Sequence, residues 1–354
     1  MILLMFIGDF FSDARAKNMV DTIVDNNLDV EIIDTGGGES IYRNKKIHHI
    51  SLPNSGIYRY IKFYIKSKKI IKTIKPKCII SGDLYSLPSA SSYRPKKLIY
   101  DSREIYTQLA GLKGRPFKQK FWSQIEKLFI YKASSILVTA ESDAEVIKSI
   151  YGPVMCLTIK NFPSKYNLQP HPKSLARILG INKKTPIFLY QGMIYKGRGI
   201  EQVFNLLNSF SSAHYVILGQ GHYREKLEQR ARELDIANRV HFLGKIPYSQ
   251  LLSYTATATI GFSLIEPVTK SYEHALPNKV FEYAAVGLPV VATNLPEMKR
   301  AVKEYSLGYC VDFGDQEGLK SVVEKILNTG RTENFIPNPN ILWESQAEIF
   351  VSVL

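Results

Sequence analysis

Short apolar runs alternate with longer amphipathic stretches along the whole chain. Apolar runs such as residues 2–7 are typical of buried strands, whereas apolar positions three or four residues apart predict helices. In the first half, this pattern predicts strands near residues 2–7, 29–34, 77–80, 97–100 and 135–139 and helices near 13–26, 57–74, 116–131 and 141–149. The alternation predicts a doubly wound α/β domain with a parallel sheet.

A polar, proline-bearing stretch follows Asn161-Phe162-Pro163 and is typical of an interdomain linker. The alternation then restarts, with strands predicted at 186–191, 214–218, 239–243, 258–262, 289–292 and 308–312 and helices near 199–209, 222–234, 247–256, 278–286 and 315–328. Residues 343–354 read as one last amphipathic helix. The sequence therefore predicts two Rossmann-like domains, over 1–165 and 175–335, and a C-terminal segment over 340–354.

The bulk composition is that of an ordinary globular protein. The chain has 354 residues, 45% of them hydrophobic and 22% charged, and its three cysteines lie far apart, as expected for reduced thiols of a cytosolic protein. The first apolar run stops at Gly8 and has no basic leader, so we interpret it as a strand rather than a signal peptide. No apolar stretch approaches the roughly 20 residues that span a bilayer. We therefore expect a cytoplasmic protein.

Most of the net charge of +14 lies in the first half. The densest part is residues 57–77, which hold no acidic residue and carry the basic residues Arg59, Lys62, Lys66, Lys68, Lys69, Lys72, Lys75 and Lys77 among isoleucines and aromatic residues. Residues 113–122 have the same character. Peripheral contact with an anionic membrane is one interpretation, and a solvated helix face is another. Nucleic-acid binding is a weaker third, because no nucleic-acid motif accompanies the charge.

Glycine-rich turns follow three successive strands of the second domain. Gly192, Gly197 and Gly199 surround Arg198 after the first strand. Gly219 and Gly221 follow the second strand, and Gly244 follows the third. Glycine lets a phosphate or a base approach the backbone closely, and the free N–H groups at a helix start favour an anion. Arg198 adds a forked donor for phosphate oxygens, although a tight turn with an exposed arginine is the plainer alternative.

Residues 276–292 carry the most informative chemistry. They predict a loop, a short helix, a Gly-Leu-Pro turn and a buried strand, with Lys279 on the loop and Glu282 in the first turns of the helix. A lysine offers a cation to a diphosphate, and a carboxylate accepts hydrogen bonds from ribose hydroxyls. The alternatives are an exposed loop lysine and a glutamate that caps its own helix.

Taken in order, these segments resemble family 4 of the retaining, nucleotide-sugar-dependent glycosyltransferases, which have the two-domain GT-B fold. The resemblance rests on Tyr-Gln-Gly-x4-Gly-Arg-Gly-Ile-Glu, Leu-Gly-x-Gly, Val-x-Phe-Leu-Gly-x-Ile-Pro and Leu-Pro-Asn-Lys-Val-Phe-Glu-Tyr, within residues 185–312. It implies a donor site in the C-terminal domain and an acceptor site in the N-terminal domain. The implied donor-binding residues are Gly192, Gly197, Arg198, Gly219, Gly221, Gly244, Asn278, Lys279 and Glu282, with Glu282 on the ribose and Arg198 and Lys279 on the diphosphate.

The chain departs from the family pattern at several positions. His274 stands where the family has the first glutamate of its Glu-x7-Glu signature, and Met193 stands where an arginine is common. In the first domain, Asp101 and Glu104 resemble part of an Asp-x-His-Glu segment, but Arg103 replaces the histidine. We predict catalytic roles for Arg198, Lys279, His274, Asp101 and Glu104. For Asp101 and Glu104, helix capping is an equal alternative.

The resemblance implies transfer of a sugar from a UDP- or GDP-linked donor to a hydroxyl of a glycan or lipid-linked acceptor, with retention. Surface polysaccharide or glycolipid assembly at the inner face of a membrane is the expected context. It also implies that the last helix crosses back to the N-terminal domain. We expect no metal, because the sequence has no Asp-x-Asp pair and no His/Cys cluster. A nucleotide-sugar binding protein without transferase activity and a nucleotide-sugar epimerase are the alternative functions.

Overall fold

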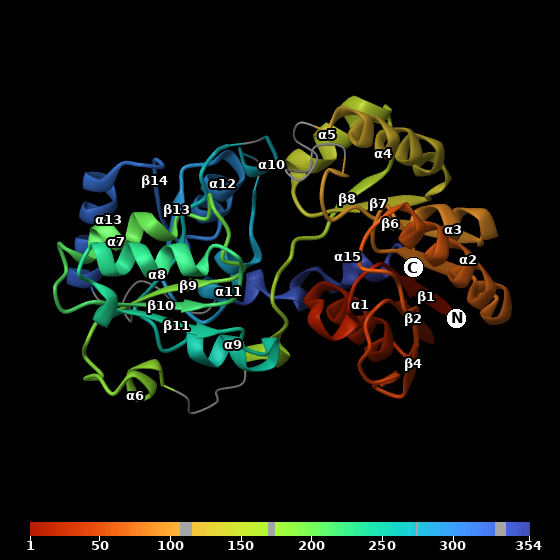
Figure 1. Cartoon of the computed structure of the whole chain (residues 1–354). Helices are drawn as coiled ribbons and strands as arrows, with labels where there is room; N and C mark the ends of the chain where they lie inside the picture. Colours follow the sequence, from red (N-terminus) through yellow and green to blue (C-terminus); the bar gives the residue numbers. More distant parts are fainter. Residues whose placement is uncertain (107–114, 169–173, 269, 274, 330–337) are drawn as a thin grey trace. The chain divides into compact units, whose positions relative to one another are not determined.

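The chain folds into two compact α/β units in the computed structural model (Figure 1). The structure describes residues 1–106, 115–168, 174–268, 270–273, 275–329 and 338–354. Unit 1 comprises residues 1–161 and 346–354, and unit 2 comprises residues 162–345. The last nine residues therefore pack in unit 1, where α15 (Ala347–Val351) contacts α1 (Ala14–Asp25).

Unit 1 is built on an eight-stranded sheet with the strand order β3-β4-β2-β1-β5-β6-β7-β8. The strands are β1 (Ile2–Met5), β2 (Val30–Asp34), β3 (Ile41–Tyr42), β4 (Lys45–His49), β5 (Cys78–Ser81), β6 (Lys97–Asp101), β7 (Ser135–Val138) and β8 (Cys156–Thr158). All neighbours pair in parallel except β3 and β4, which form an antiparallel pair. The strand order reverses between β1 and β5, the place where open α/β sheets bind ligands.

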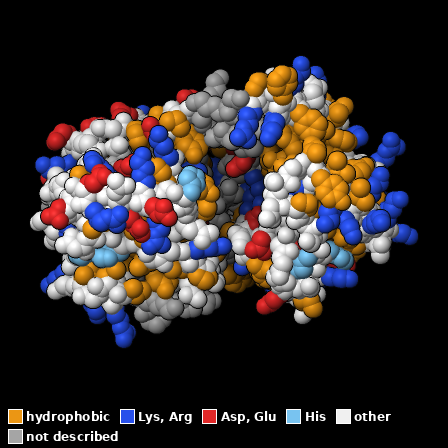
Figure 2. All heavy atoms as spheres, in the orientation of Figure 1, with side chains coloured by type: hydrophobic (Ala, Val, Ile, Leu, Met, Phe, Trp, Pro, Cys, Tyr) orange, Lys and Arg blue, Asp and Glu red, His pale blue; other side chains and the backbone are white. Residues whose placement is uncertain are grey.

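The remaining helices of unit 1 are α2 (Ile57–Ile74), α3 (Leu87–Tyr93), α4 (Pro116–Phe129) and α5 (Glu141–Tyr151). Helices α2, α3 and α5 send Phe63, Leu87 and Ile147 into one core cluster with Leu3 and Met5 of β1. Helix α3 contacts both α2 and α4, so these three helices lie together on the sheet. Figure 2 shows orange and blue side chains gathered over this part of unit 1.

Unit 2 is built on a six-stranded parallel sheet with the strand order β11-β10-β9-β12-β13-β14. The strands are β9 (Ile187–Gln191), β10 (His214–Leu218), β11 (Val240–Gly244), β12 (Ile260–Ser263), β13 (Val290–Thr293) and β14 (Gly308–Val311). The order reverses between β9 and β12. Residues that follow these two strands therefore meet at the crevice where such sheets place their ligands.

Helices cover both faces of the unit 2 sheet. They are α6 (Leu175–Leu179), α7 (Ile200–Leu207), α8 (Arg224–Glu233), α9 (Tyr248–Thr255), α10 (Lys270–Glu273), α11 (Asn278–Ala285), α12 (Pro296–Glu304) and α13 (Gln316–Thr329). Because side chains alternate along a strand, Ile187 and Leu189 pack with α6, α9, α11 and α12, whereas Phe188 and Tyr190 pack with α7, α8 and α13. Burial on both faces explains why the strands read as continuous apolar runs.

Some predicted elements need correction. The chain over 343–354 is not one helix, because a 3-10 turn at Trp343–Gln346 precedes the short α15. The strands β3, β4 and β8 and the helices α3, α6, α10 and α12 were not predicted. Within the described residues, none of the helices combines the length and the hydropathy that a membrane span requires.

Candidate functional site

The loop between β9 and α7 begins at Gly192 and ends at Gly199. Both glycines have positive φ, +125° and +68°, which side chains rarely adopt. Gly199 is the N-cap of α7. Its missing Cβ also matters, because a Cβ there would lie 1.8 Å from the carbonyl oxygen of Leu264. The loop is therefore pressed against the chain that follows β12.

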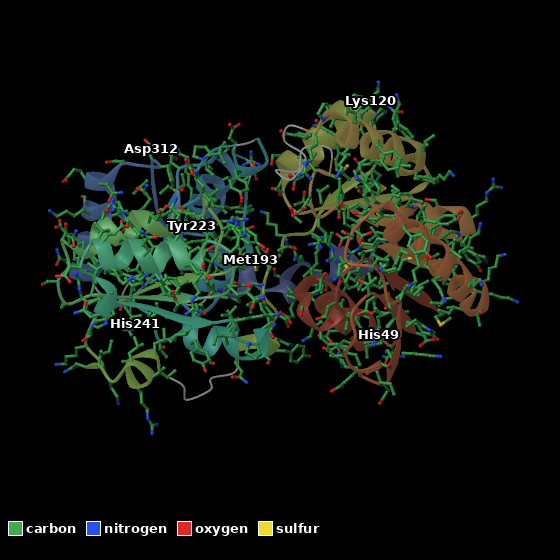
Figure 3. The ribbon with its side chains drawn as sticks, in the orientation of Figure 1. His49, Lys120, Met193, Tyr223, His241 and Asp312 are labelled. Carbon is green, nitrogen blue, oxygen red and sulfur yellow. The ribbon has the colours of Figure 1, made fainter. Side chains whose placement is uncertain are left out.

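The glycines after β10 bring a second loop against the first. A Cβ on Gly219 would lie 1.8 Å from the carbonyl oxygen of Gly192, and one on Gly221 would lie 2.2 Å from that of Ile194. Backbone hydrogen bonds join the same segments, from Ile194 N to Gln220 O (2.9 Å) and from Gly219 N to Gly244 O (2.8 Å). The predicted turns after β9, β10 and β11 thus meet at one edge of the sheet. Met193, labelled in Figure 3, marks the first of them.

Glu282 lies on α11 and is buried, with 6% of its surface exposed. Its carboxylate accepts hydrogen bonds from Gln191 Nε2 and from the hydroxyl of Tyr248. Burial raises the pKa of Glu282 above its ordinary value, and these hydrogen bonds and the charge of Lys279 oppose the rise. The carboxylate therefore reaches across to β9 and α9 and does not serve as a helix cap.

Gln191, the last residue of β9, has its side-chain amide held at both ends. Its Nε2 donates to Glu282, and its Oε1 accepts a hydrogen bond of 2.7 Å from the hydroxyl of Thr255. Its backbone N–H donates to the hydroxyl of Tyr283 (3.0 Å). The Thr255 hydroxyl thus sets the orientation of the amide that presents a donor to Glu282.

Lys279 differs from its prediction as a loop residue, because it lies in the first turn of α11 and is buried, with 8% exposed. Its Nζ stands 3.6 Å from the centre of the Tyr190 ring, a cation–π contact. A Cβ on Gly192 would lie 3.3 Å from the same nitrogen, so the Lys279 ammonium packs against the loop between β9 and α7. Burial, and then the charge of Arg198, hold the pKa of Lys279 well below its ordinary value, against an opposing effect of Glu282.

Arg198 lies between Gly197 and Gly199, with its guanidinium 5.0 Å from the centre of the Tyr272 ring. Its Nε is buried and has no hydrogen-bond partner among the described residues. Arg198 is also near enough to Lys279 to lower its pKa. Two cations and a set of glycine loops therefore share this edge of the sheet, an arrangement suited to a diphosphate.

The other predicted donor residues lie farther from Glu282 along the chain or at the surface. Gly197 has a φ of +82° and accepts a backbone hydrogen bond from Glu266 (3.0 Å). Gly244 has a φ of +76° and open space around it. Asn278 is exposed at the start of α11. His274 lies outside the described residues, so its role stays a prediction.

In unit 1, Asp101 is fully buried at the end of β6. Its two oxygens accept hydrogen bonds from Arg15 (2.7 and 3.0 Å) and from Arg103 Nε (2.8 Å), and Arg103 also pairs with Asp13. Burial alone would raise the pKa of Asp101, but the two arginines hold it below its ordinary value. Arg15 therefore forms a buried ion pair with Asp101.

This geometry makes Asp101 an anchor for the two arginines, because their hydrogen bonds occupy both of its oxygens. Glu104 is exposed three residues further on. The acceptor roles of both residues stay predictions. Elsewhere in the unit, His49 on β4 (Figure 3) lies 2.5 Å from the buried carboxylate of Asp34.

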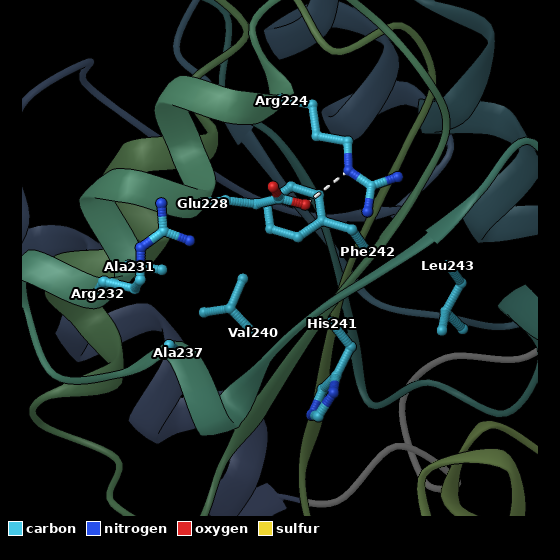
Figure 4. Close-up of a pocket in the computed structure, with 9 residues that line it drawn as sticks. All are labelled: Arg224, Glu228, Ala231, Arg232, Ala237, Val240, His241, Phe242 and Leu243. Carbon is cyan, nitrogen blue, oxygen red and sulfur yellow. Dashed lines mark hydrogen bonds and ion pairs between the residues drawn. The ribbon is translucent and has the colours of Figure 1, made fainter.

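A separate pocket of about 360 Å³ lies between α8 and the edge strand β11 (Figure 4). It is lined by Arg224, Glu228, Ala231, Arg232, Ala237, Val240, His241, Phe242 and Leu243. Arg224 donates to Glu228 at 2.7 Å inside it, and no predicted donor residue lines it. Within the described ranges, no group of three His, Cys, Asp or Glu side chains is placed to hold a metal ion.

Three polar residues around Glu282 and Lys279 were not predicted from the sequence: Gln191, Tyr248 and Thr255. Gln191 belongs to the motif Tyr-Gln-Gly-x4-Gly-Arg-Gly-Ile-Glu. A glutamine at the end of a strand does not by itself indicate a hydrogen bond to Glu282. Tyr248 and Thr255 lie on α9, and neither belongs to a recognisable motif. Only the packing of α9 against α11 brings them to Glu282 and Gln191.

The chain is similar to known glycosyltransferases. Residues 173–338 match the family model for glycosyl transferases group 1. The capsular polysaccharide biosynthesis glycosyltransferase CapM of Staphylococcus aureus is 22% identical over 88% of this chain and 84% of its own length. The lipopolysaccharide core biosynthesis glycosyltransferase LpsE of Rhizobium meliloti (strain 1021) is 25% identical over 40% of this chain and 39% of its own.

Solved structures share the fold over the full length. Sucrose-phosphate synthase from Thermosynechococcus elongatus has a TM-score of 0.81 at 15% identity and covers 100% of this chain and 98% of its own. Anabaena HepE in complex with UDP-glucose has a TM-score of 0.76 at 15% identity, covering 99% and 98%. Residues 173–338 thus resemble the glycosyl transferases group 1, and the two parallel-sheet units share the two-domain fold of solved glycosyltransferase structures.

Proposed function

We propose that this chain transfers a sugar from a nucleoside-diphosphate sugar to an acceptor hydroxyl with retention, in the assembly of a surface polysaccharide or glycolipid. The observation that carries the donor class is the grouping of buried Glu282 and Lys279 with Arg198 beside the glycine turns of unit 2. The biosynthetic context draws on the names of the relatives CapM and LpsE. The UDP-glucose bound to HepE supports the donor class.

The ribose and the diphosphate of the donor each have a partner in this arrangement. The Glu282 carboxylate accepts hydrogen bonds from ribose hydroxyls, for which Gln191 and Tyr248 hold it in place. The diphosphate lies against the glycine turns, with Arg198 and Lys279 supplying positive charge. The missing Cβ atoms leave the backbone of these turns open to close approach.

The chemical step breaks the bond between the anomeric carbon and the phosphate oxygen and forms a bond to the acceptor oxygen on the same face. The departing phosphate oxygen, which gains negative charge, takes the proton of the acceptor hydroxyl. Arg198 and Lys279 stabilise that charge in a buried site, where a fixed donor contributes most. Because these two cations balance the leaving group, we propose that transfer needs no metal ion.

The test is a transfer assay on the purified chain with UDP- and GDP-linked sugars and a panel of lipid-linked acceptors, with the anomeric configuration of the product read by NMR. We expect a product with the donor's configuration, formed at the same rate in the presence of a chelator. Removing one charge-stabilising donor, in Lys279→Ala or Arg198→Ala, should lower kcat by about 10²–10³. Lys245→Ala, an exposed lysine beyond β11, is the matched control.

Four outcomes would contradict parts of this proposal. Donor binding without transfer or hydrolysis would indicate a binding protein, and conversion of the donor sugar without an acceptor would indicate an epimerase. An inverted product would exclude retention. Unchanged kinetics in both charge variants would remove Arg198 and Lys279 from the site.

A further inference from the structure

Helices α2 and α4 of unit 1 expose a row of large apolar side chains. On α2, Ile57, Ile61 and Ile65 follow one another at four-residue spacing and are 58%, 48% and 49% exposed. On α4, Phe117 is 88% and Leu128 63% exposed. The opposite side of α2 is buried through Phe63, Ser67 and Ile71, so its isoleucine row is a second apolar stripe that faces out.

The same surface is basic and has no exposed carboxylate. Helix α2 contains no acidic residue, and the one in α4, Glu126, is buried under the hydroxyls of Tyr100 and Tyr151. The exposed lysines on and just beyond the two helices are Lys66, Lys69, Lys72, Lys75, Lys77, Lys118, Lys120 and Lys127. None of these lysines forms an ion pair with a described residue. Their charge is therefore available to an external anion.

An aromatic cluster holds the two helices as one surface. The rings of Tyr60 on α2 and Trp122 on α4 have centroids 4.8 Å apart, and both contact Tyr85 at the same distance. Phe121, 45% exposed, packs on Trp122 at 5.1 Å and continues the cluster to the surface. Figure 2 shows hydrophobic and basic side chains side by side over this region. We call it the α2–α4 face.

We propose that the α2–α4 face docks on the surface of an anionic lipid bilayer. Its isoleucine, leucine and phenylalanine side chains enter the boundary between headgroups and acyl chains, and its lysines contact the anionic headgroups. Trp122 and its neighbouring tyrosines lie at the headgroup level, which such rings favour. A nucleic acid would use the lysines but would leave the exposed aliphatic side chains in water, so lipid fits the face better.

The α2–α4 face belongs to unit 1, whereas all the predicted donor-binding residues belong to unit 2, so docking is independent of donor binding. A chain that failed as a transferase would still bind vesicles, and a chain that failed to bind vesicles would still bind nucleotide. Docking would give the enzyme access to an acceptor carried on a lipid.

The experiment measures binding of the full chain to vesicles of phosphatidylglycerol and phosphatidylcholine and to vesicles of phosphatidylcholine alone. We expect binding to the anionic vesicles, weakened by salt, and quenching of Trp122 fluorescence by acyl chains that carry bromine. The other tryptophan, Trp343, is buried in unit 2 with 2% exposed, so the quenching reports Trp122.

Two surface variants separate the contributions of the apolar side chains and of the lysines to vesicle binding. Phe117→Ser/Phe121→Ser and Lys66→Glu/Lys69→Glu/Lys72→Glu should each weaken binding by about tenfold or more, since several inserted side chains or charges are lost. The matched controls are Ile41→Ser, a 61% exposed isoleucine elsewhere on unit 1, and Lys183→Glu/Lys184→Glu on unit 2. Neither control should change vesicle binding.

Thermal unfolding of each variant shows that it is folded, as expected for changes at exposed positions. No binding to anionic vesicles, or equal losses in variants and controls, would overturn the proposal. Binding to a single-stranded oligonucleotide that the lysine variant loses, without vesicle binding, would assign the face to nucleic acid instead.

Discussion

Among single residues, Gln191 and Tyr248 hold the Glu282 carboxylate by hydrogen bonds, and Thr255 holds Gln191. A buried carboxylate with one oxygen bound to a fixed amide cannot rotate freely, which holds it ready for a ligand. We infer that the Thr255 hydroxyl acts through Gln191 as a positioning group.

The variant Thr255→Val tests this arrangement, since valine keeps the shape of the side chain and removes the hydroxyl. We expect the Kd for the nucleoside diphosphate to rise about tenfold, the equivalent of one hydrogen bond in a buried network. Thr255→Ser should restore most of the affinity. Thr257→Val is a control, because the hydroxyl of Thr257 bonds to backbone groups alone among the described residues, and it should alter stability but not affinity. Equal losses of affinity in the two valine variants would contradict the positioning role.

We expect Lys279 to make nucleotide binding depend on pH. Its pKa is well below the ordinary lysine value in the free protein, and a bound diphosphate stabilises the protonated form and raises that pKa. Binding should therefore take up protons, and affinity should fall as the pH rises through the pKa of the free protein.

Calorimetry of UDP and GDP binding in buffers of different ionisation enthalpy measures this proton uptake. We expect uptake in the wild-type chain and in Glu282→Gln at a ligand concentration that still saturates it, and no uptake in Lys279→Met. Proton release, or the same uptake in Lys279→Met, would contradict the role given to the Lys279 ammonium.

At the scale of elements, the strands of both sheets were predicted best because burial on both faces makes them continuous apolar runs. The hairpin β3–β4 was not predicted, because the sequence of β4, Lys-Lys-Ile-His-His, is mostly polar. Its turn residues, Arg43 and Asn44, have positive φ but are not glycines, so the turn was not recognised either. Helix α3 is rich in serine, which favours turns and caps over helix interiors. Local pattern alone therefore underestimates elements that packing stabilises.

The glycine turns also show what a local sequence pattern cannot predict. Their presence at the strand ends was predicted, but not that Gly219 and Gly221 press on the carbonyl groups of the first loop. The burial of Lys279 was also not predictable, because a lysine in the first turn of a helix is usually exposed. Its cover comes from Tyr190 and the Gly192 loop, which are far away in sequence.

At the scale of the whole molecule, the two units carry different surfaces for different tasks. Unit 2 gathers the predicted donor residues at the point where its strand order reverses, and unit 1 carries the basic and apolar α2–α4 face. The family resemblance implied a ribose as the partner of Glu282, and the structure adds the side chains of Gln191 and Tyr248 that position this carboxylate. His274 and the acceptor contacts stay predictions.

We propose above all that unit 2 binds a nucleoside-diphosphate sugar through Glu282, Lys279 and Arg198. The most direct measurement is thermal unfolding of the chain with UDP, GDP and their sugars, because a ligand that binds the folded state raises the melting temperature. We expect the melting temperature to rise with the concentration of one of the two nucleotides. This rise should be strongly reduced in Glu282→Gln and Lys279→Met. No rise with any of these ligands, or an equal rise in the wild-type chain and both variants, would contradict this proposal.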